Sequence, residues 1–251
     1  MRLILALLLL MALPLSAEEI VLGLDRDEVA ITTDFNGSDV TIYGAVKRDR
    51  PTPDAGPLAV IITLAGPSEP VTVRRKERMF GIWVNTDAVD VDAAPSFYAV
   101  ATSAPLSESL LAVEDLRYGI SIPRVIRSVG APDTITDAPS FSDALIRIRA
   151  GTGLYQVLEN GIDLEQETLF RGQITLPAAL TEGDYVARIY LTRDGRVIDQ
   201  YETSIAVFKA GLERWLFDLS RNQPLIYGLM SLAIAISAGW LASAAFRIFR
   251  R

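Results

Sequence analysis

The residue types that most often perform catalysis are scarce in this chain of 251 residues. It contains no His and no Cys, so the Ser-His-Asp and Cys-His arrangements of nucleophilic enzymes are excluded. Zinc, haem and iron–sulfur sites lack their usual ligands for the same reason. Serine–lysine chemistry would need Lys47, Lys76 or Lys209, and none of them lies in a Ser-x-x-Lys motif. We therefore expect no enzymatic activity and no bound cofactor.

Carboxylates are the remaining candidates for binding an ion. Two groups could offer oxygens to calcium: Asp87, Asp90 and Asp92, and Asp25, Asp27 and Glu28. Calcium takes six or more oxygens from a compact loop, and neither group follows the order of an EF-hand. A calcium site and a merely solvated acidic surface both stay open for these groups. The solvated surface is the simpler interpretation, and we predict no metal site.

Charge is distributed unevenly along the chain. Between Glu18 and Ala210 there are 29 acidic and 18 basic residues, an excess that disfavours nucleic acid and general adhesion to anionic lipid. The acidity could match a basic partner, although solubility alone would explain it. One basic run, residues 74–78 (RRKER), could dock an acidic partner or lipid headgroups. It could equally be a solvated hairpin loop, which is the simpler interpretation.

The two ends of the chain have the patterns of export and membrane anchoring. Arg2, an apolar run and Ala17 before two glutamates predict a signal peptide over residues 1–17, against the alternative of an uncleaved anchor. Residues 224–246 predict a transmembrane helix that starts at Pro224, because the range 225–246 carries no charge. The arginines of a cytoplasmic tail, residues 247–251, favour a cytoplasmic C-terminus. We expect a single-pass protein of a bacterial inner membrane whose N-terminal part is periplasmic.

Two faces of the C-terminal helices could make contacts. Small residues recur at every fourth position of the predicted span, which would let a second helix approach closely, although chance would also explain them. These helix-packing candidates are Ser231, Ala235, Gly239 and Ser243. An amphipathic helix over residues 210–221 is predicted to lie at the membrane interface. Its interfacial anchors are Leu212, Trp215, Leu216 and Leu219.

The region between the signal peptide and these helices alternates mainly with period two, which predicts a mainly β fold. We expect two tandem antiparallel, immunoglobulin-like β-sandwich units, at residues 18–104 and 140–208, separated by a helix and linker at 105–139. In the linker, Ser107 is a plausible N-cap and Gly119 a helix stop. In the second unit, residues 144–149 (ALIRIR) read as a strand, and Asp194-Gly195 predicts a tight hairpin turn.

The C-terminal half resembles a family of transmembrane proteins from alphaproteobacteria that are about as long as this chain. The likeness covers residues 140–246 well, and the first unit in outline. It is carried by Gly153-Leu154-Tyr155, Leu169-Phe170-Arg171, Leu176-Pro177, Gly183-Asp184-Tyr185, residues 190–195 (YLTRDG), Glu213-Arg214-Trp215, Gln223-Pro224-Leu225, Tyr227-Gly228 and Gly239-Trp240. The resemblance implies an inner-membrane protein with a periplasmic domain, and it assigns no catalytic residue. Because members of that family often neighbour permeases of the sulfite-exporter type, it also implies a transport accessory.

Three hypotheses follow for the function. The leading one is a non-enzymatic protein that binds another protein of a membrane complex such as a transporter, or associates with itself through the span. The alternative is a periplasmic sensor or ligand-binding module, which would show a pocket with convergent polar groups. A hydrolase with two carboxylates across a cleft is the third.

Overall fold

The computed structural model describes residues 18–25, 28–31, 35–48, 56–127, 135, 137–209 and 212–249. The predicted signal peptide lies outside these residues. The chain divides into two compact units. The β unit comprises residues up to Val29 together with Asn36–Val207, and the C-terminal unit comprises Ala30–Phe35 and the residues from Phe208 onward.

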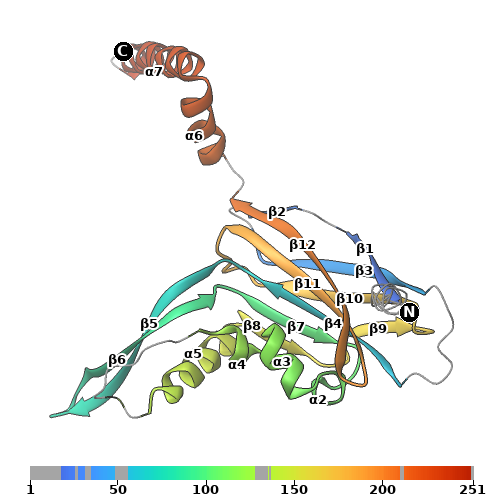
Figure 1. Cartoon of the computed structure of the whole chain (residues 1–251). Helices are drawn as coiled ribbons and strands as arrows, with labels where there is room; N and C mark the ends of the chain where they lie inside the picture. Colours follow the sequence, from blue (N-terminus) through green and yellow to red (C-terminus); the bar gives the residue numbers. More distant parts are fainter. Residues whose placement is uncertain are drawn as a thin grey trace, which may run out of the picture. The chain divides into compact units, whose positions relative to one another are not determined.

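The β unit contains two large sheets (Figure 1). One sheet has four strands in the order β1-β3-β10-β9, and the other has six in the order β2-β12-β11-β4-β7-β8. The strands are β1 (Glu18–Leu24), β2 (Glu28–Ile31), β3 (Ser38–Arg48), β4 (Leu58–Ala65), β5 (Ser68–Met79), β6 (Ile82–Pro95), β7 (Tyr98–Thr102), β8 (Tyr155–Leu158), β9 (Ile162–Glu165), β10 (Leu169–Leu176), β11 (Gly183–Arg193) and β12 (Arg196–Lys209). The mainly β fold class is thereby confirmed.

The two large sheets pack face to face, and side-chain patterns show it. In β10 buried and exposed residues alternate strictly, so its inward positions are Phe170, Gly172, Ile174 and Leu176. The sheets approach closely at Gly172, because a Cβ there would lie 3.1 Å from Cδ1 of Ile62 in the other sheet. β4 behaves differently: its first seven residues are all buried, which is the pattern of a strand covered on both faces.

Helices cover the second face of the six-stranded sheet. They are α2 (Leu106–Ser109), α3 (Ala112–Tyr118), α4 (Ile122–Val125) and α5 (Pro139–Gly151). The core on this side joins Ile61 and Tyr190 of the sheet to Leu110 and Ile120 of the helical layer. Tyr98 fixes the layer, because its buried hydroxyl donates a hydrogen bond of 2.8 Å to the carbonyl of Ile120.

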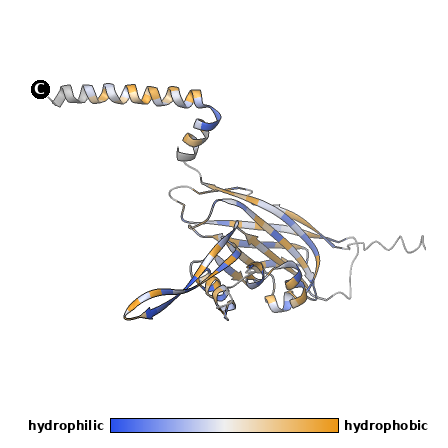
Figure 2. Ribbon diagram, turned by 60° about the vertical axis from the view of Figure 1, so that its left-hand side comes forward, coloured by the Kyte–Doolittle hydropathy of each residue, from blue (hydrophilic) through white to orange (hydrophobic). Residues whose placement is uncertain are grey.

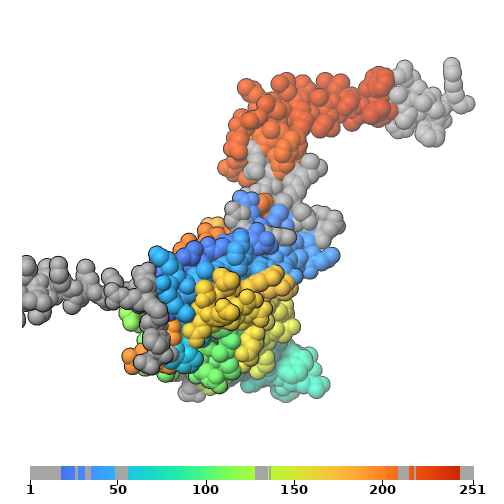
Figure 3. Space-filling model, turned by 90° about the vertical axis from the view of Figure 1, so that its right-hand side faces the viewer, coloured from blue at the N-terminus to red at the C-terminus, as the bar shows by residue number. Residues whose placement is uncertain are grey.

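The predicted division into two tandem β units must be corrected. β3 pairs with β10 and β4 pairs with β11, so strands from both sides of the predicted linker share each large sheet. Figure 3 shows the consequence on the surface, where the blue and yellow segments lie against one another. Local alternation reveals that a strand exists, but it holds no information about distant pairing partners. The immunoglobulin-like detail stays a prediction.

Residues 144–149 were predicted as a strand and form part of helix α5 instead. Phe141 and Leu145 are its buried residues, four positions apart on one helical face. Six residues are too few to separate a period of 2 from one of 3.6, and Pro139 in the first turn was the better signal. In the linker, Ser107 lies inside α2 and is not its N-cap, whereas Gly119 ends α3 in a left-handed conformation, as predicted.

The hairpin turn between β11 and β12 is confirmed. Arg193 and Arg196 face each other across the turn, and the two central residues, Asp194 and Gly195, have φ values of 50° and 74°. Positive φ at both positions is what a type I′ turn requires. The carbonyl of Gly195 accepts a 2.8 Å hydrogen bond from the N–H of Leu111, so the turn also holds the start of α3.

The C-terminal unit contains helices α6 (Leu212–Asn222) and α7 (Pro224–Phe249). Gln223 joins them, since its N–H donates to the carbonyl of Leu219 and its carbonyl accepts from the N–H of Tyr227. The range Pro224–Ser243 is long and apolar enough to cross a membrane: its 20 residues span about 30 Å as a helix. Among the described residues this is the one candidate span.

Candidate interaction surfaces

Strands β5 and β6 form a two-stranded sheet of their own, which projects from the rest of the β unit as an arm (Figure 1). The arm is pinned at its base by α5. Val73, Val89 and Val91 of the arm pack in one apolar cluster with Phe141 and Leu145 of α5. This half of the arm is therefore held as part of the folded unit.

Arg75 lies where the held base of the arm gives way to its outer half. Its guanidinium donates hydrogen bonds to the carboxylates of Asp137 and Asp87 and to Oγ of Ser140. It also lies over the ring of Phe141, 4.6 Å from the centroid. The hydrogen bond from Arg75 holds the pKa of Asp137 below its usual value, and Asp137 in turn raises the pKa of Arg75. The interactions of Arg75 thus stabilise the fold.

The outer end of the arm, here called the tip (residues 79–84), is apolar and exposed. Phe80 is fully exposed, and Ile82 and Trp83 are 66% and 69% exposed. Met79 pairs with Ile82 across the turn, whose central residues Phe80 and Gly81 have φ values of 49° and 89°. A bulky residue with positive φ is uncommon, because Asn, Asp or Gly adopts that conformation at lower cost.

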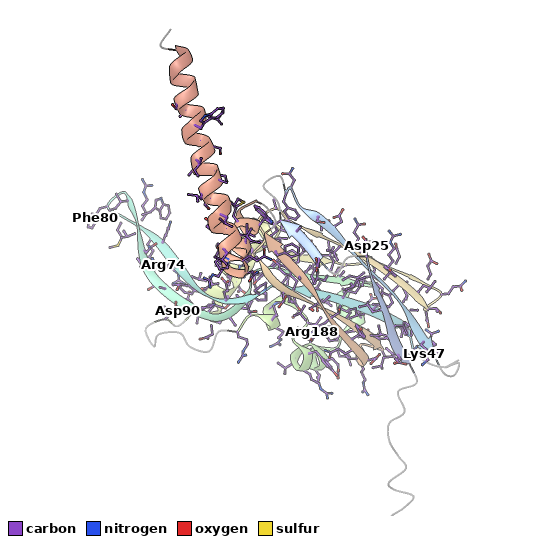
Figure 4. All side chains as sticks on the ribbon, turned by 90° about the horizontal axis from the view of Figure 1, so that it is seen from above. Asp25, Lys47, Arg74, Phe80, Asp90 and Arg188 are labelled. Atoms are coloured by element: carbon purple, nitrogen blue, oxygen red, sulfur yellow. The ribbon has the colours of Figure 1, made fainter. Side chains whose placement is uncertain are left out.

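The strand register divides the outer arm into two faces. Met79 opposite Ile82 and Glu77 opposite Val84 lie on one face. Arg78 opposite Trp83 and Lys76 opposite Asn85 lie on the other. Figure 2 shows apolar and polar residues intermixed along the arm, and Figure 4 shows Phe80 at its end with Arg74 farther along β5. The basic run predicted as a hairpin loop therefore lies within β5, just before the turn.

The predicted helix-packing face lies on α7. Ser231, Ala235, Gly239 and Ser243 are all exposed, and a Cβ placed on Gly239 would meet nothing within 4 Å. Ser237 lies on the opposite side of the helix and donates to the carbonyls of Ala233 and Ile234. A role for this face in packing stays a prediction.

The predicted interfacial anchors lie on α6, which forms as expected. Positions 212, 215, 216 and 219 share one face of this helix. The side chain of Leu212 lies outside the described residues, Trp215 is exposed, and Leu216 and Leu219 are half-buried. Phe217 is also exposed, on another face, with Arg221 over its ring.

Two of the acidic residues considered for calcium are engaged within the arm. Asp87 pairs with Arg75, and Asp90 accepts a 2.6 Å hydrogen bond from Thr72. Asp27 lies outside the described residues. Across the part of the chain that the structure describes, no three His, Cys, Asp or Glu side chains gather into a group that could hold a metal ion.

Two further clusters of polar side chains stand out in the β unit. Glu18 is almost fully buried, and its carboxylate accepts hydrogen bonds from Arg48 and Arg193 at 2.9 and 2.7 Å. The outer face of the four-stranded sheet carries an open hollow of about 320 Å³ lined by Asp25, Thr41, Tyr43 and Arg171. The first is a structural ion-pair network, and the second has the polar groups but not the apolar walls of a typical ligand pocket.

Sequence reasoning identified the basic run but not the tip. The signal was available in residues 79–84 (MFGIWV), where a glycine interrupts five large apolar residues directly after four cations. It was missed because the period-two alternation of this region predicts half-buried strands, whose alternate side chains would be covered. In the structure both faces of the outer arm are exposed.

Comparisons with known proteins give the chain a family. The family model described as "Putative transmembrane protein (Alph_Pro_TM)" matches residues 19–248. No curated protein matches. The crystal structure of Spo0M, a sporulation control protein from Bacillus subtilis, aligns with 82% of this chain and 55% of its own at 10% identity, with a TM-score of 0.29. The chain thus spans about half the length of that protein.

Proposed function

The chain belongs to the Alph_Pro_TM family of transmembrane proteins, and from this premise we propose that it is a non-enzymatic binding accessory of a membrane complex such as a transporter. In this proposal α7 anchors the protein in a bacterial inner membrane, the β unit lies in the periplasm and the C-terminus is cytoplasmic. The family and the candidate span support the membrane anchor. The orientation follows from Arg247, Arg250 and Arg251, because positive residues beside a span favour the cytoplasmic side.

The observation that carries the accessory role is the open small-residue face of α7. Nearly every described side chain of this helix is exposed, so among the described residues no second helix packs along its small-residue face. Between helices in lipid, small residues allow close backbone approach and tight packing. Gly239 leaves room for such an approach, since a Cβ placed there would meet no group outside its own stretch of helix within 4 Å.

The environments of the polar groups support a non-enzymatic role. Glu18 is neutralised by two arginines, and Arg75 by two carboxylates. Burial raises the pKa of Tyr155, whose hydroxyl donates to the carbonyl of Pro95 and accepts from Arg149. Each of these groups is paired within the core or at its edge, and none of them lines the hollow of the four-stranded sheet.

The experiment is a matched pair of substitutions in the full chain. Gly239→Ile fills the small-residue face, whereas Ser237→Ile adds comparable bulk about 200° around the same helix. Complexes captured by crosslinking intact membranes are compared by size and composition. The proposal predicts that Gly239→Ile loses a membrane partner or a second copy that Ser237→Ile retains. Identical complexes from both variants would contradict a role for this face.

The hollow on the four-stranded sheet favours the alternative, a periplasmic sensor or ligand-binding module. It brings the opposite charges of Asp25 and Arg171 beside the ring of Tyr43. A small zwitterionic solute would match these groups. Arg171→Ala should abolish any shift of the melting temperature by such solutes, and a screen of amino acids that shifts nothing would remove this candidate.

A further inference from the structure

We propose that the tip of the β5–β6 arm binds the interface of an anionic phospholipid bilayer and so forms a second membrane contact, separate from α7. The tip is a different surface from the small-residue face of α7 on which the proposed function rests. Three features meet in this one hairpin: an exposed apolar end, flanking cations and a strained turn.

Three apolar side chains of the tip are left largely uncovered by the described residues. Phe80 is fully exposed, while Ile82 and Trp83 keep about two thirds of their surface in contact with solvent. Large apolar groups gathered at one end of a projecting element mark a membrane or protein contact more often than a free surface. Trp is the side chain that prefers the level of the lipid headgroups, because its ring is apolar and its N–H is polar.

The conformation of Phe80 adds an independent observation. It occupies the first central position of a two-residue turn with φ of 49°, where a bulky side chain is strained and Asn or Gly is preferred. The hairpin can fold without an aromatic ring at this position. An aromatic ring is needed there only if the end of the arm makes a contact.

The charge of the outer arm selects an anionic surface. Arg74, Lys76 and Arg78 flank the tip, and in the described part of the chain no ion pair involves any of them. Glu77 is the one acid among residues 74–85, although the exported region as a whole is acidic. A cationic patch on an otherwise acidic protein is attracted locally to anionic headgroups while the remaining surface is repelled. The arm therefore presents its tip to the lipid first.

The pattern of the two faces fits a bilayer interface. One face carries Met79, Ile82 and Val84, which can enter the boundary of the acyl chains. The other places Trp83 opposite Arg78, so that a long cationic side chain can extend to phosphates at the level of the indole. A specific protein interface buries about 20–30 residues on each side. The six residues of the tip are too few for one, but they suffice for insertion by a protein that another helix already tethers to the membrane.

Absence of cysteine makes the test direct. A single Asn85→Cys in the full chain carries a nitrobenzoxadiazole fluorophore beside the tip, and Val157→Cys carries it at an exposed position of β8 as the control. Each protein is reconstituted in zwitterionic vesicles, with or without phosphatidylglycerol. We expect the Asn85 label, and not the Val157 label, to shift to the blue and to be quenched by nitroxide lipids in anionic vesicles. High salt should weaken both effects.

Phe80→Asn separates binding from folding. Because Asn suits the turn, the variant should fold at least as stably as the parent, yet lose the blue shift and the lipid quenching. Lys76→Glu with Arg78→Glu should lose the dependence on phosphatidylglycerol.

Added empty anionic vesicles that become bound to the proteoliposomes would show that the tip reaches a second bilayer, whereas signals without such bridging would place it on the membrane that holds α7. If iodide in solution quenches the Asn85 label equally in all vesicles, the proposal is overturned. It is also overturned if only a co-purified protein protects the label from iodide.

Discussion

The guanidinium of Arg75 lies 4.6 Å from the centre of the Phe141 ring, and this contact joins the projecting arm to helix α5. Phe141 is buried among Val73, Val89 and Leu145. The arm is therefore anchored by a helix that local sequence patterns had assigned to a strand. The anchored base of the arm contributes to stability, and the exposed tip is available for contact.

Phe141→Ala should destabilise the β unit by about 3–5 kcal/mol, because it removes a buried ring and leaves a cavity under the arm. Urea unfolding of the purified chain, followed by circular dichroism, measures the loss. Ile148→Ala on the same helix is the control, since Ile148 is 60% exposed and should change stability by no more than about 0.5 kcal/mol. Equal effects of the two variants would contradict the packing of α5 against the arm.

Glu18→Gln should cost about 3 kcal/mol, because two arginines would then face a neutral group in a nearly buried site. Glu19→Gln is the matched control. Its pair with Lys47 is exposed on both sides, so its loss should cost less than about 1 kcal/mol. Thermal unfolding at neutral pH compares them, and a Glu18→Gln protein as stable as Glu19→Gln would refute the structural role of the network.

Gly195→Ala should destabilise the hairpin by about 1–2 kcal/mol, because its φ of 74° is left-handed and a Cβ would lie 3.0 Å from Leu111. Gly151→Ala tests the opposite case at the end of α5, where a Cβ would meet nothing within 4 Å. There alanine should stabilise by about 0.5–1 kcal/mol through helix propensity. Effects of the same sign in both variants would argue against the type I′ turn.

Stability should be nearly flat between about pH 6 and 9 and fall above about pH 10. No His or Cys side chain titrates in the flat range. Burial raises the pKa of Tyr155, Tyr185 and Tyr190 above that of an unfolded tyrosine. The unfolded chain then loses protons first as pH rises, so stability is full below about pH 10 and is lost through the folded pKa values. Melting temperatures measured across this range check the prediction, and a drop near pH 7 would contradict it.

Local signals in the sequence predicted local structure well. Asp194-Gly195 specified its turn because positive φ at two positions restricts the residue types, and Pro224 with the uncharged run after it specified the start of α7. Such features depend on neighbouring residues alone. They could be predicted without knowledge of the fold.

Features that depend on distant partners could not be predicted in the same way. The pairing of β3 with β10 crosses more than half of the β unit, and no short pattern reports it. Helix α5 was mistaken for a strand because Ile146 and Ile148 alternate with polar neighbours. The helical conformation is favoured instead by the packing of Phe141 against the arm, which is distant in sequence. The tip was missed because exposure of both faces of a hairpin depends on what packs nearby.

The most direct test of the accessory role is crosslinking of the full chain in native membranes, followed by mass spectrometry and native sizing. The account predicts a stoichiometric membrane partner, or a second copy, whose crosslinks map to α7 near Gly239 and disappear in Gly239→Ile. Recovery of the protein as a monomer with no reproducible crosslinked partner, in both the parent and that variant, would contradict it.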